Sequence, residues 1–144
     1  MKVLVSILLA LSVLTGCKQD EPKTTEYKIT GRTYTRFKDM GILGGTPYYE
    51  GCKFISSDSV IKFQYFENYP LPFATTVVYP KYQLSYKSKY PYKLNYPNFT
   101  IQLGGLAGNF GEIINSDVIK LSNNTMMTET TDTELIKFLT DSIK

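Results

Sequence analysis

The sequence predicts an all-β domain: a small antiparallel up-and-down meander of about eight strands that closes into a barrel and ends in a short helix. Three observations predict this fold. Apolar and polar residues alternate over short stretches, turn-forming pairs separate these stretches, and a helical spacing of apolar residues occurs only near the C-terminus. Closing such a meander into a barrel removes its exposed edges.

The candidate strands follow one another closely along the chain. In order they are residues 27–37, 51–56, 60–66, 82–86, 92–96, 99–103, 112–115 and 118–121. Turns are expected at Ser57-Asp58, at Pro80-Lys81, where Tyr79 would pair with Tyr82, and at Asn123-Asn124, because asparagine tolerates a positive φ. The glycine-rich segment 104–111 is expected to form a flexible loop, since its spacing fits neither a P-loop nor a dinucleotide-binding fingerprint.

The clearest alternation lies in residues 79–99, which are rich in tyrosine and lysine and contain no acidic residue. A two-residue turn at Pro97-Asn98 would place six apolar side chains on one face of a hairpin. The pairs would be Tyr96 with Phe99, Leu94 with Ile101 and Tyr92 with Leu103.

The C-terminal region has the only helical pattern. Thr131 and Glu134 form a candidate capping box. One helical face then carries Leu135, Phe138, Leu139 and Ile143.

The N-terminus has the features of an export signal. Lys2 precedes the apolar run 3–14, which suits a signal-peptide h-region and is too short to span a membrane. The Leu14-Thr15-Gly16-Cys17 sequence that follows resembles the lipobox of bacterial lipoproteins, in which the cysteine is acylated and becomes the first residue of the mature chain. An ordinary secretory signal cut near Gly16 is the alternative.

Three segments follow from this interpretation. Residues 1–16 are the lipoprotein signal peptide, residues 17–26 are the acylated cysteine with a flexible polar tether, and residues 27–144 are the barrel domain with its helix. The lysine and acidic residues after Cys17 resemble the export signal of surface lipoproteins in Bacteroidetes. We therefore expect a lipid anchor in the outer membrane. Whether the domain faces the periplasm or the outside of the cell is left open by the sequence.

The residue types available limit the chemistry. The chain has no histidine, so Ser-His and Cys-His pairs are excluded and the usual zinc ligand sets are missing. Cys52 is expected to be a buried core thiol. The carboxylates Glu50, Asp58, Glu67 and Glu112 are expected at solvated loops or rims. We expect no enzymatic activity, no metal and no cofactor.

Several stretches together resemble the lipocalin-like lipoproteins of Bacteroidetes. They are Gly31-Arg32-Thr33-Tyr34, Phe63-Gln64-Tyr65, Tyr86, the segment 92–103, Gly111-Glu112-Ile113 and the segment 121–126. Tyr34 stands near the place where lipocalins carry the tryptophan of a Gly-x-Trp motif. The resemblance implies a lipocalin-like barrel.

Two functions are open. The first is a binding module that holds a small amphipathic or glycan-like ligand in or at the mouth of a tyrosine-rich barrel. Its candidate ligand-binding residues are Tyr65, Tyr86, Tyr92 and Tyr96, because tyrosine offers an apolar ring and a polar tip. The alternative is a structural or interaction lipoprotein with a filled barrel, acting as an accessory subunit or inhibitor of another surface protein. An empty lumen favours the first function and a packed lumen the second.

Two further surface features are candidates for sites. Lys81, Lys87, Lys89 and Lys93 form a candidate basic face for a polyanion other than nucleic acid, with a solvated sheet face as the alternative. In the strand pattern Lys87 and Lys93 face solvent, while Lys81 and Lys89 lie in turns. Asp58-Ser59-Val60 resembles the O-glycosylation sequon of Bacteroidetes and makes Ser59 a candidate acceptor, as does the Asp141-Ser142-Ile143 match.

Overall fold

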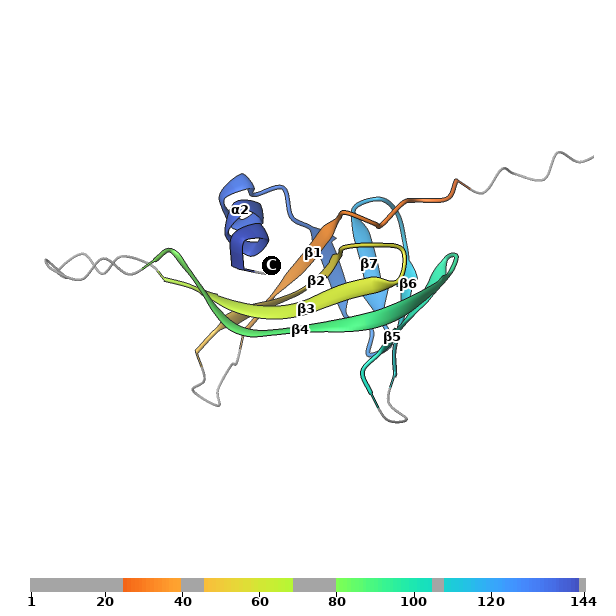
Figure 1. Ribbon diagram of the computed structural model, residues 1–144, viewed down its shortest axis with the longest axis horizontal. Coiled ribbons are helices and arrows are strands. Elements are labelled where there is room, and N and C mark those ends of the chain that lie inside the picture. The colour runs from red at the N-terminus through yellow and green to blue at the C-terminus, as the bar shows by residue number, and fades with distance from the viewer. Residues whose placement is uncertain (1–24, 40–45, 69–79, 105–107, 143–144) are drawn as a thin grey trace, which may run out of the picture.

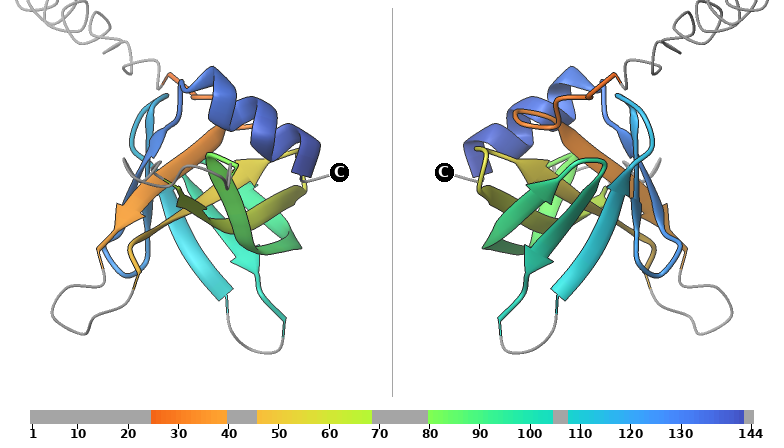
Figure 2. Two further views of the ribbon diagram at one scale, coloured as in Figure 1. Left: turned by 90° about the vertical axis from the view of Figure 1, so that its left-hand side faces the viewer. Right: turned by 90° about the vertical axis from the view of Figure 1, so that its right-hand side faces the viewer.

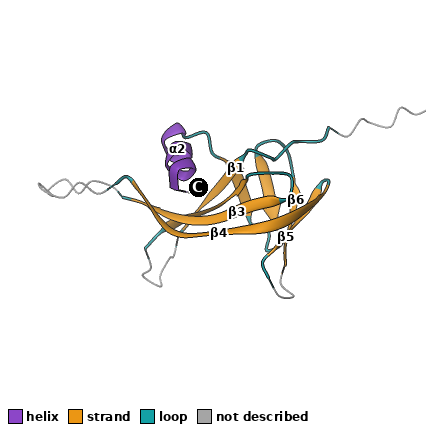
Figure 3. Cartoon of the chain, viewed as in Figure 1, coloured by secondary structure: helices purple, strands orange, loops and turns teal. Residues whose placement is uncertain are grey.

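A computed structural model shows a closed barrel of eight antiparallel strands with the C-terminal helix packed on its outside (Figures 1 and 3). The structure describes residues 25–39, 46–68, 80–104 and 108–142. Each strand pairs with its neighbour in the sequence, and the last strand pairs with the first. The predicted fold class is therefore confirmed.

The barrel strands are β1 (Thr33–Lys38), β2 (Tyr48–Phe54), β3 (Ser59–Glu67), β4 (Tyr82–Asn95), β5 (Asn98–Gln102), β6 (Gly108–Ile113), β7 (Val118–Leu121) and β8 (Met126–Glu129). The helix α2 spans Thr133–Ser142. The signal peptide and most of the tether predicted from the sequence lie outside the described residues.

One end of the barrel is filled by apolar side chains that all eight strands contribute. The largest are Tyr34, Phe54, Tyr92, Phe99, Ile101 and Ile119, each at most 3% exposed. The segment before β1 covers this closed end. Its residue Ile29 is buried in the same cluster, and the Gly31 amide donates to the Phe54 carbonyl at 2.7 Å. Figure 2 shows this segment beside α2, at the end opposite to where β1 and β5 finish.

A second apolar cluster lies outside the barrel, where α2 covers β2, β3 and β4. It joins Leu135 and Leu139 of the helix to Phe63, Tyr65 and Tyr82 of the strands. Thus Leu135 and Leu139 are buried as predicted, whereas Ile143 lies outside the described residues. The helix begins with a different cap from the one expected. The Asp132 carboxylate, not Thr131, accepts from the amides of Glu134 and Leu135, at 2.9 and 3.1 Å.

β4 is one continuous strand of 14 residues rather than two short ones, so Lys89 lies in a strand and not in a turn. Tyr65 of β3 is opposite Leu84, but Gln64 is opposite Tyr86, which leaves Ser85 as an extra residue in a β-bulge. The Ser85 hydroxyl donates to the Gln64 carbonyl at 3.2 Å there. Leu84 consequently faces α2 while Tyr86 faces the lumen, whereas regular alternation along the candidate strand 82–86 would place both on one face.

The β4–β5 hairpin keeps the predicted faces with a different register. Tyr92 pairs with Ile101 and Leu94 with Phe99, so the turn is Tyr96-Pro97 instead of Pro97-Asn98. The shift of two residues does not move any side chain to the other face, because side chains alternate with period two. It does bring Leu94 to the end of the hairpin, where 45% of it is exposed.

The Asn123-Asn124 turn and the glycine-rich segment 104–111 agree only in part with the sequence predictions. Asn124 has a positive φ of 62° as expected, but β7 and β8 pair as Lys120 with Met126, whereas a two-residue turn at Asn123-Asn124 would pair Leu121 with Met126. The glycine-rich segment is not wholly a loop, because Gly108 to Gly111 belong to β6. Gly111 lies against the Phe99 ring, where a Cβ atom would be 2.2 Å from Cζ. Tyr79, the expected partner of Tyr82, lies outside the described residues.

Candidate functional site

The lumen is not filled along its whole length. At the end opposite Ile29 it holds a cavity of about 200 Å³, which we call the mouth cavity. Its polar lining is Arg36, Lys38, Glu50, Lys62, Gln64, Tyr86, Asn109 and Asn123, and the side chains of Leu121 and Met127 border its apolar side. The barrel therefore has an apolar, closed half and a polar, open half.

Strand alternation places these polar groups inside. Arg36 and Lys38 follow the buried Tyr34 at two-residue spacing, and Glu50 precedes the buried Cys52 in the same way. The register sets Arg36 opposite Glu50 and Cys52 opposite Lys62. Four charged side chains thus project from three adjacent strands toward one cavity.

Arg36 and Glu50 form an ion pair across β1 and β2. The guanidinium contacts the Glu50 carboxylate through both Nε and a terminal nitrogen, and the side chains are 27% and 20% exposed. Such partial burial weakens the competition from water, so the geometry of the pair is held more firmly than that of a surface ion pair.

The two lysines of the mouth cavity are not neutralised by this pair. Lys38 Nζ lies 5.9 Å from the centre of the Tyr48 ring, in a cation–π contact. Lys62 forms neither an ion pair nor a hydrogen bond within the described part of the chain. Three cations and one carboxylate therefore give the cavity a positive balance.

The neutral polar groups of the cavity also have spare hydrogen-bonding capacity. The side-chain amides of Gln64 and Asn109 have no protein partner among the described residues. Asn123 uses its carbonyl oxygen to accept from the Thr125 amide at 3.2 Å, which leaves its NH₂ group available. The Tyr86 and Tyr90 hydroxyls lie 2.5 Å apart, and this hydrogen bond raises the pKa of Tyr86 and lowers that of Tyr90.

Of the four tyrosines proposed from the sequence, Tyr86 alone lines the mouth cavity. Tyr65 lies on the outer face under α2, where burial raises its pKa. Tyr92 is in the packed half and its hydroxyl donates to the Ser56 carbonyl at 3.0 Å. Tyr96 lies at the closed end and donates to the Thr25 carbonyl at 2.8 Å.

The four lysines of the candidate basic face lie on the outside of the barrel, and two of them contact α2. Lys81 forms a 2.7 Å ion pair with Glu134, and Lys87 donates to the Ser142 carbonyl at 2.6 Å. Lys89 and Lys93 are exposed and have no hydrogen bond or ion pair within the described segments. The structure does not gather all four into one patch of free ammonium groups.

The remaining candidate residues are accounted for separately. Cys52 is fully buried as predicted, and burial raises the pKa of its thiol to about 12. Ser59 begins β3 and its hydroxyl donates to the Asp58 carboxylate at 2.9 Å.

Of the carboxylates expected at rims or loops, Glu50 is inside the lumen instead, while Asp58 lies in the β2–β3 turn and Glu112 on the outer face. In the described ranges no three His, Cys, Asp or Glu side chains gather as a metal site.

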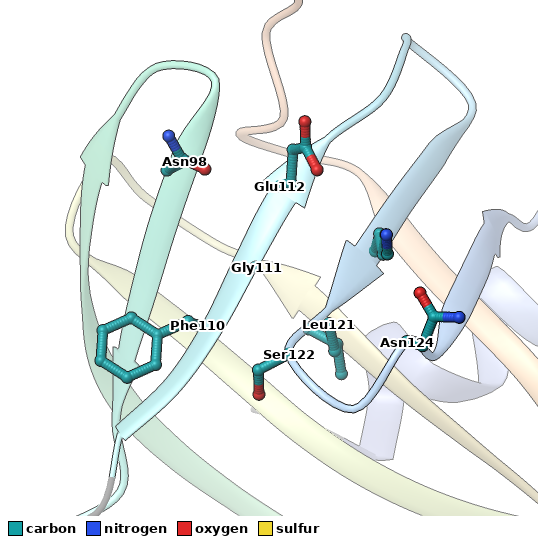
Figure 4. Close-up of a pocket in the computed structure, with 8 residues that line it drawn as sticks. Asn98, Phe110, Gly111, Glu112, Leu121, Ser122 and Asn124 are labelled. Carbon is teal, nitrogen blue, oxygen red and sulfur yellow. The ribbon is translucent and has the colours of Figure 1, made fainter.

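A shallower groove of about 300 Å³ lies on the outer face of β5, β6 and β7 (Figure 4). Its side chains include Asn98, Phe110, Ser122 and Asn124, and Glu112 is opposite Lys120 in the β6–β7 register. We call it the outer groove. Its single cation and single carboxylate lie on neighbouring strands, so it has no excess of either charge.

Comparisons with models of protein families, with curated proteins and with solved structures give no match to this chain. Within the described residues no helix has the length and the apolar character needed to cross a membrane.

Proposed function

We propose that the protein is a lipid-anchored binding module of the bacterial cell envelope, holding a small glycan-like or amphipathic ligand at the mouth of its barrel. The observation that carries the proposal is the division of the lumen. Its closed half is packed with apolar side chains, whereas its open half has a cavity of about 200 Å³ lined by charged and amide groups.

The polar lining favours binding over a purely structural role. Replacing a partly buried ion pair by apolar side chains of similar volume is often neutral or stabilising, so Arg36 and Glu50 are poor choices for filling a core. The amide groups of Gln64 and Asn109, which have no partner in the described part of the chain, are also unfavourable when they are half-buried. A polar ligand gives each of these groups a hydrogen-bonding partner.

The lipid anchor and the outer-membrane location belong to the same proposal. They are supported by the lipobox-like Leu14-Thr15-Gly16-Cys17 sequence and by the polar residues after it. A durable anchor needs more than one acyl chain, and lipidation of Cys17 in the manner of bacterial lipoproteins would supply it.

A contact with another surface protein is the second candidate function, with the protein as a non-catalytic accessory subunit or inhibitor. Two exposed apolar side chains on the outer wall favour it. Phe110, which borders the outer groove, is 60% exposed, and Met126, opposite Lys120 in the β7–β8 register, is 48% exposed.

Side-chain amide signals in NMR spectra separate these candidates. The full-length chain is titrated with octyl glucoside and with free monosaccharides, and the NH₂ resonances of asparagine and glutamine are followed. Binding at the mouth cavity moves the signals of Gln64 and Asn109, while Asn98 and Asn124 of the outer groove serve as controls.

A matched pair of variants checks the location. Asn109→Phe fills the mouth cavity and should abolish the titration, whereas Asn98→Phe adds the same side chain to the outer wall and should leave it intact. If every tested ligand shifts only the Asn98 and Asn124 signals, or none at all, the mouth cavity is not the binding site.

A further inference from the structure

We infer that the mouth cavity selects an acidic sugar, that is, a small polyhydroxylated ring with a carboxylate or phosphate group. This inference rests on the proposed function of the mouth cavity as a ligand site and specifies the chemical class that it takes. It follows from the charge balance, the free amides and the size of the cavity.

The charge balance favours an anion. Among the described residues that line the cavity, Arg36, Lys38 and Lys62 face a single carboxylate, Glu50, which is already paired with Arg36. A cavity walled by protein concentrates the field of these cations, because the surrounding medium screens them less than water does. A bound carboxylate or phosphate compensates the positive balance that the protein leaves open.

The Lys62 ammonium is the best placed partner for that anion. It extends from β3 on the inner face, opposite Cys52 on one side and Ser88 on the other. Within the described residues it has no acidic partner, and its charge acts on the neighbouring thiol of Cys52 and the phenol of Tyr90. A ligand anion at this point replaces water around one charge without breaking an existing ion pair.

The free amides favour hydroxyl groups on the rest of the ligand. Gln64 and Asn109 each offer a donor and an acceptor, and Asn123 offers its NH₂ group. Hydroxyl groups, which both donate and accept, satisfy such a mixed set better than an alkyl chain does. Leu121 and Met127 provide an apolar surface for the C–H groups of a sugar ring.

The size of the cavity favours a single ring. Its volume of about 200 Å³ is below the roughly 300–1,000 Å³ of common small-molecule pockets. The cavity opens at the mouth, so the ring can also be the end of a longer glycan that continues into solvent.

Three sugars with the same ring test the inference: glucuronate, glucose and glucosamine carry negative, zero and positive charge. Calorimetric titration of the full-length chain should give an affinity for glucuronate about tenfold or more above that for glucose, with glucosamine weakest. The preference should shrink when the salt concentration is raised. Glucose 6-phosphate tests whether phosphate replaces carboxylate.

Variants assign the preference to the cavity. Lys62→Met should lower the affinity for glucuronate about tenfold more than that for glucose, whereas Lys120→Met in the outer groove should change neither. Lys38→Met provides a second test at the same cavity.

The two proposals fail in different ways. If glucose or octyl glucoside binds as tightly as glucuronate and Lys62→Met has no effect, the acidic-sugar inference is overturned while the mouth cavity remains a ligand site. If no sugar moves the Gln64 and Asn109 signals, both proposals are overturned.

Discussion

The Lys87 ammonium of β4 donates to the main-chain carbonyl of Ser142, the last residue of α2, at 2.6 Å. The last turn of α2 has no basic residue of its own. A cation at this end is favourable because the unpaired carbonyl groups of a helix C-terminus carry partial negative charge. A barrel strand therefore supplies the charge that the helix sequence lacks.

Loss of the Lys87 charge should loosen α2. Lys87→Met keeps most of the side-chain stem and should lower the free energy of unfolding by about 0.3–1 kcal/mol, with the difference shrinking at high salt. Denaturant unfolding provides the measurement. Lys89→Met, on the same face of β4 and without a hydrogen bond or ion pair to the described residues of α2, is the control and should change stability little. Equal effects of the two substitutions would contradict the role of Lys87.

The β4–β5 register predicts unequal costs for two apolar truncations. Ile101 is fully buried, so Ile101→Ala should cost about 2–5 kcal/mol. Leu94 is 45% exposed, and Leu94→Ala should cost less than about 1 kcal/mol because much of its surface stays in water. Similar losses in denaturant melts would favour the Pro97-Asn98 turn, which makes these two residues partners.

The contact between Gly111 and Phe99 predicts a rescue. Gly111→Ala places a methyl group into the Phe99 ring and should destabilise the barrel by about 1–3 kcal/mol. Adding Phe99→Leu should recover part of that loss, because it removes the atoms that clash. Gly108→Ala, whose Cβ would be 3.3 Å from Thr100 Cγ2, is the milder control. A double variant that is simply the sum of its parts would show that the two residues do not interact.

The N-cap of α2 predicts a pH-dependent stability. Hydrogen bonds from the Leu135 amide and from the Tyr82 hydroxyl lower the pKa of Asp132 from its ordinary value of 3.8. The pKa of Asp132 is lower in the folded than in the unfolded state. The stabilisation that ionised Asp132 gives the folded protein is therefore fully present at pH values above its ordinary pKa, and it is lost as the pH falls through the folded-state pKa.

Two substitutions separate the charge from the cap. Asp132→Ala should cost about 0.5–2 kcal/mol at neutral pH, whereas Asp132→Asn keeps a capping side chain and should lose mainly the pH dependence. Thermal unfolding of both variants between pH 2 and pH 7, measured beside the parent chain, gives the comparison. A parent and an Asp132→Asn variant with identical pH profiles would rule out this contribution of Asp132.

Acylation of Cys17 is expected to place the protein in the membrane fraction. Mass spectrometry of the chain isolated from membranes should show a lipid adduct on an N-terminal Cys17, and Cys17→Ala should release or mislocalise the protein. Cys52→Ala is a control for the other thiol, which is buried. A soluble parent chain without the adduct would refute the lipoprotein interpretation.

The fold could be predicted from the sequence because the alternation of apolar and polar residues shows which side chains face the core. Successive short strands of this kind predict a meander that closes into a barrel. Alternation does not determine register, since moving the turn by one residue, from Pro97-Asn98 to Tyr96-Pro97, shifts the strand pairing by two residues and leaves every side chain on the same face. Alternation also gives the wrong face at Ser85. The bulge there puts Leu84 and Tyr86 on opposite faces, although the sequence alternates regularly through Tyr82, Leu84 and Tyr86.

The candidate site was harder to predict, because polar residues in a strand are normally taken to face water. Arg36 and Lys62 nevertheless stand two residues after Tyr34 and Val60, which are buried in the lumen. A charged residue on the apolar side of a strand was the available signal. The tyrosines were more conspicuous in the sequence, yet three of the four candidates serve packing or hydrogen bonding away from the cavity.

The position of Ile29 also bears on how the barrel meets its surroundings. The chain enters at the closed end, where Thr25 and Ile29 contact the barrel, and the mouth cavity lies at the other end. In a chain tethered to a bilayer through Cys17, the attachment point is therefore on the side of the closed end. The cavity then samples solutes that diffuse in the aqueous phase, and a molecule dissolved in the bilayer has to leave it before it can be captured.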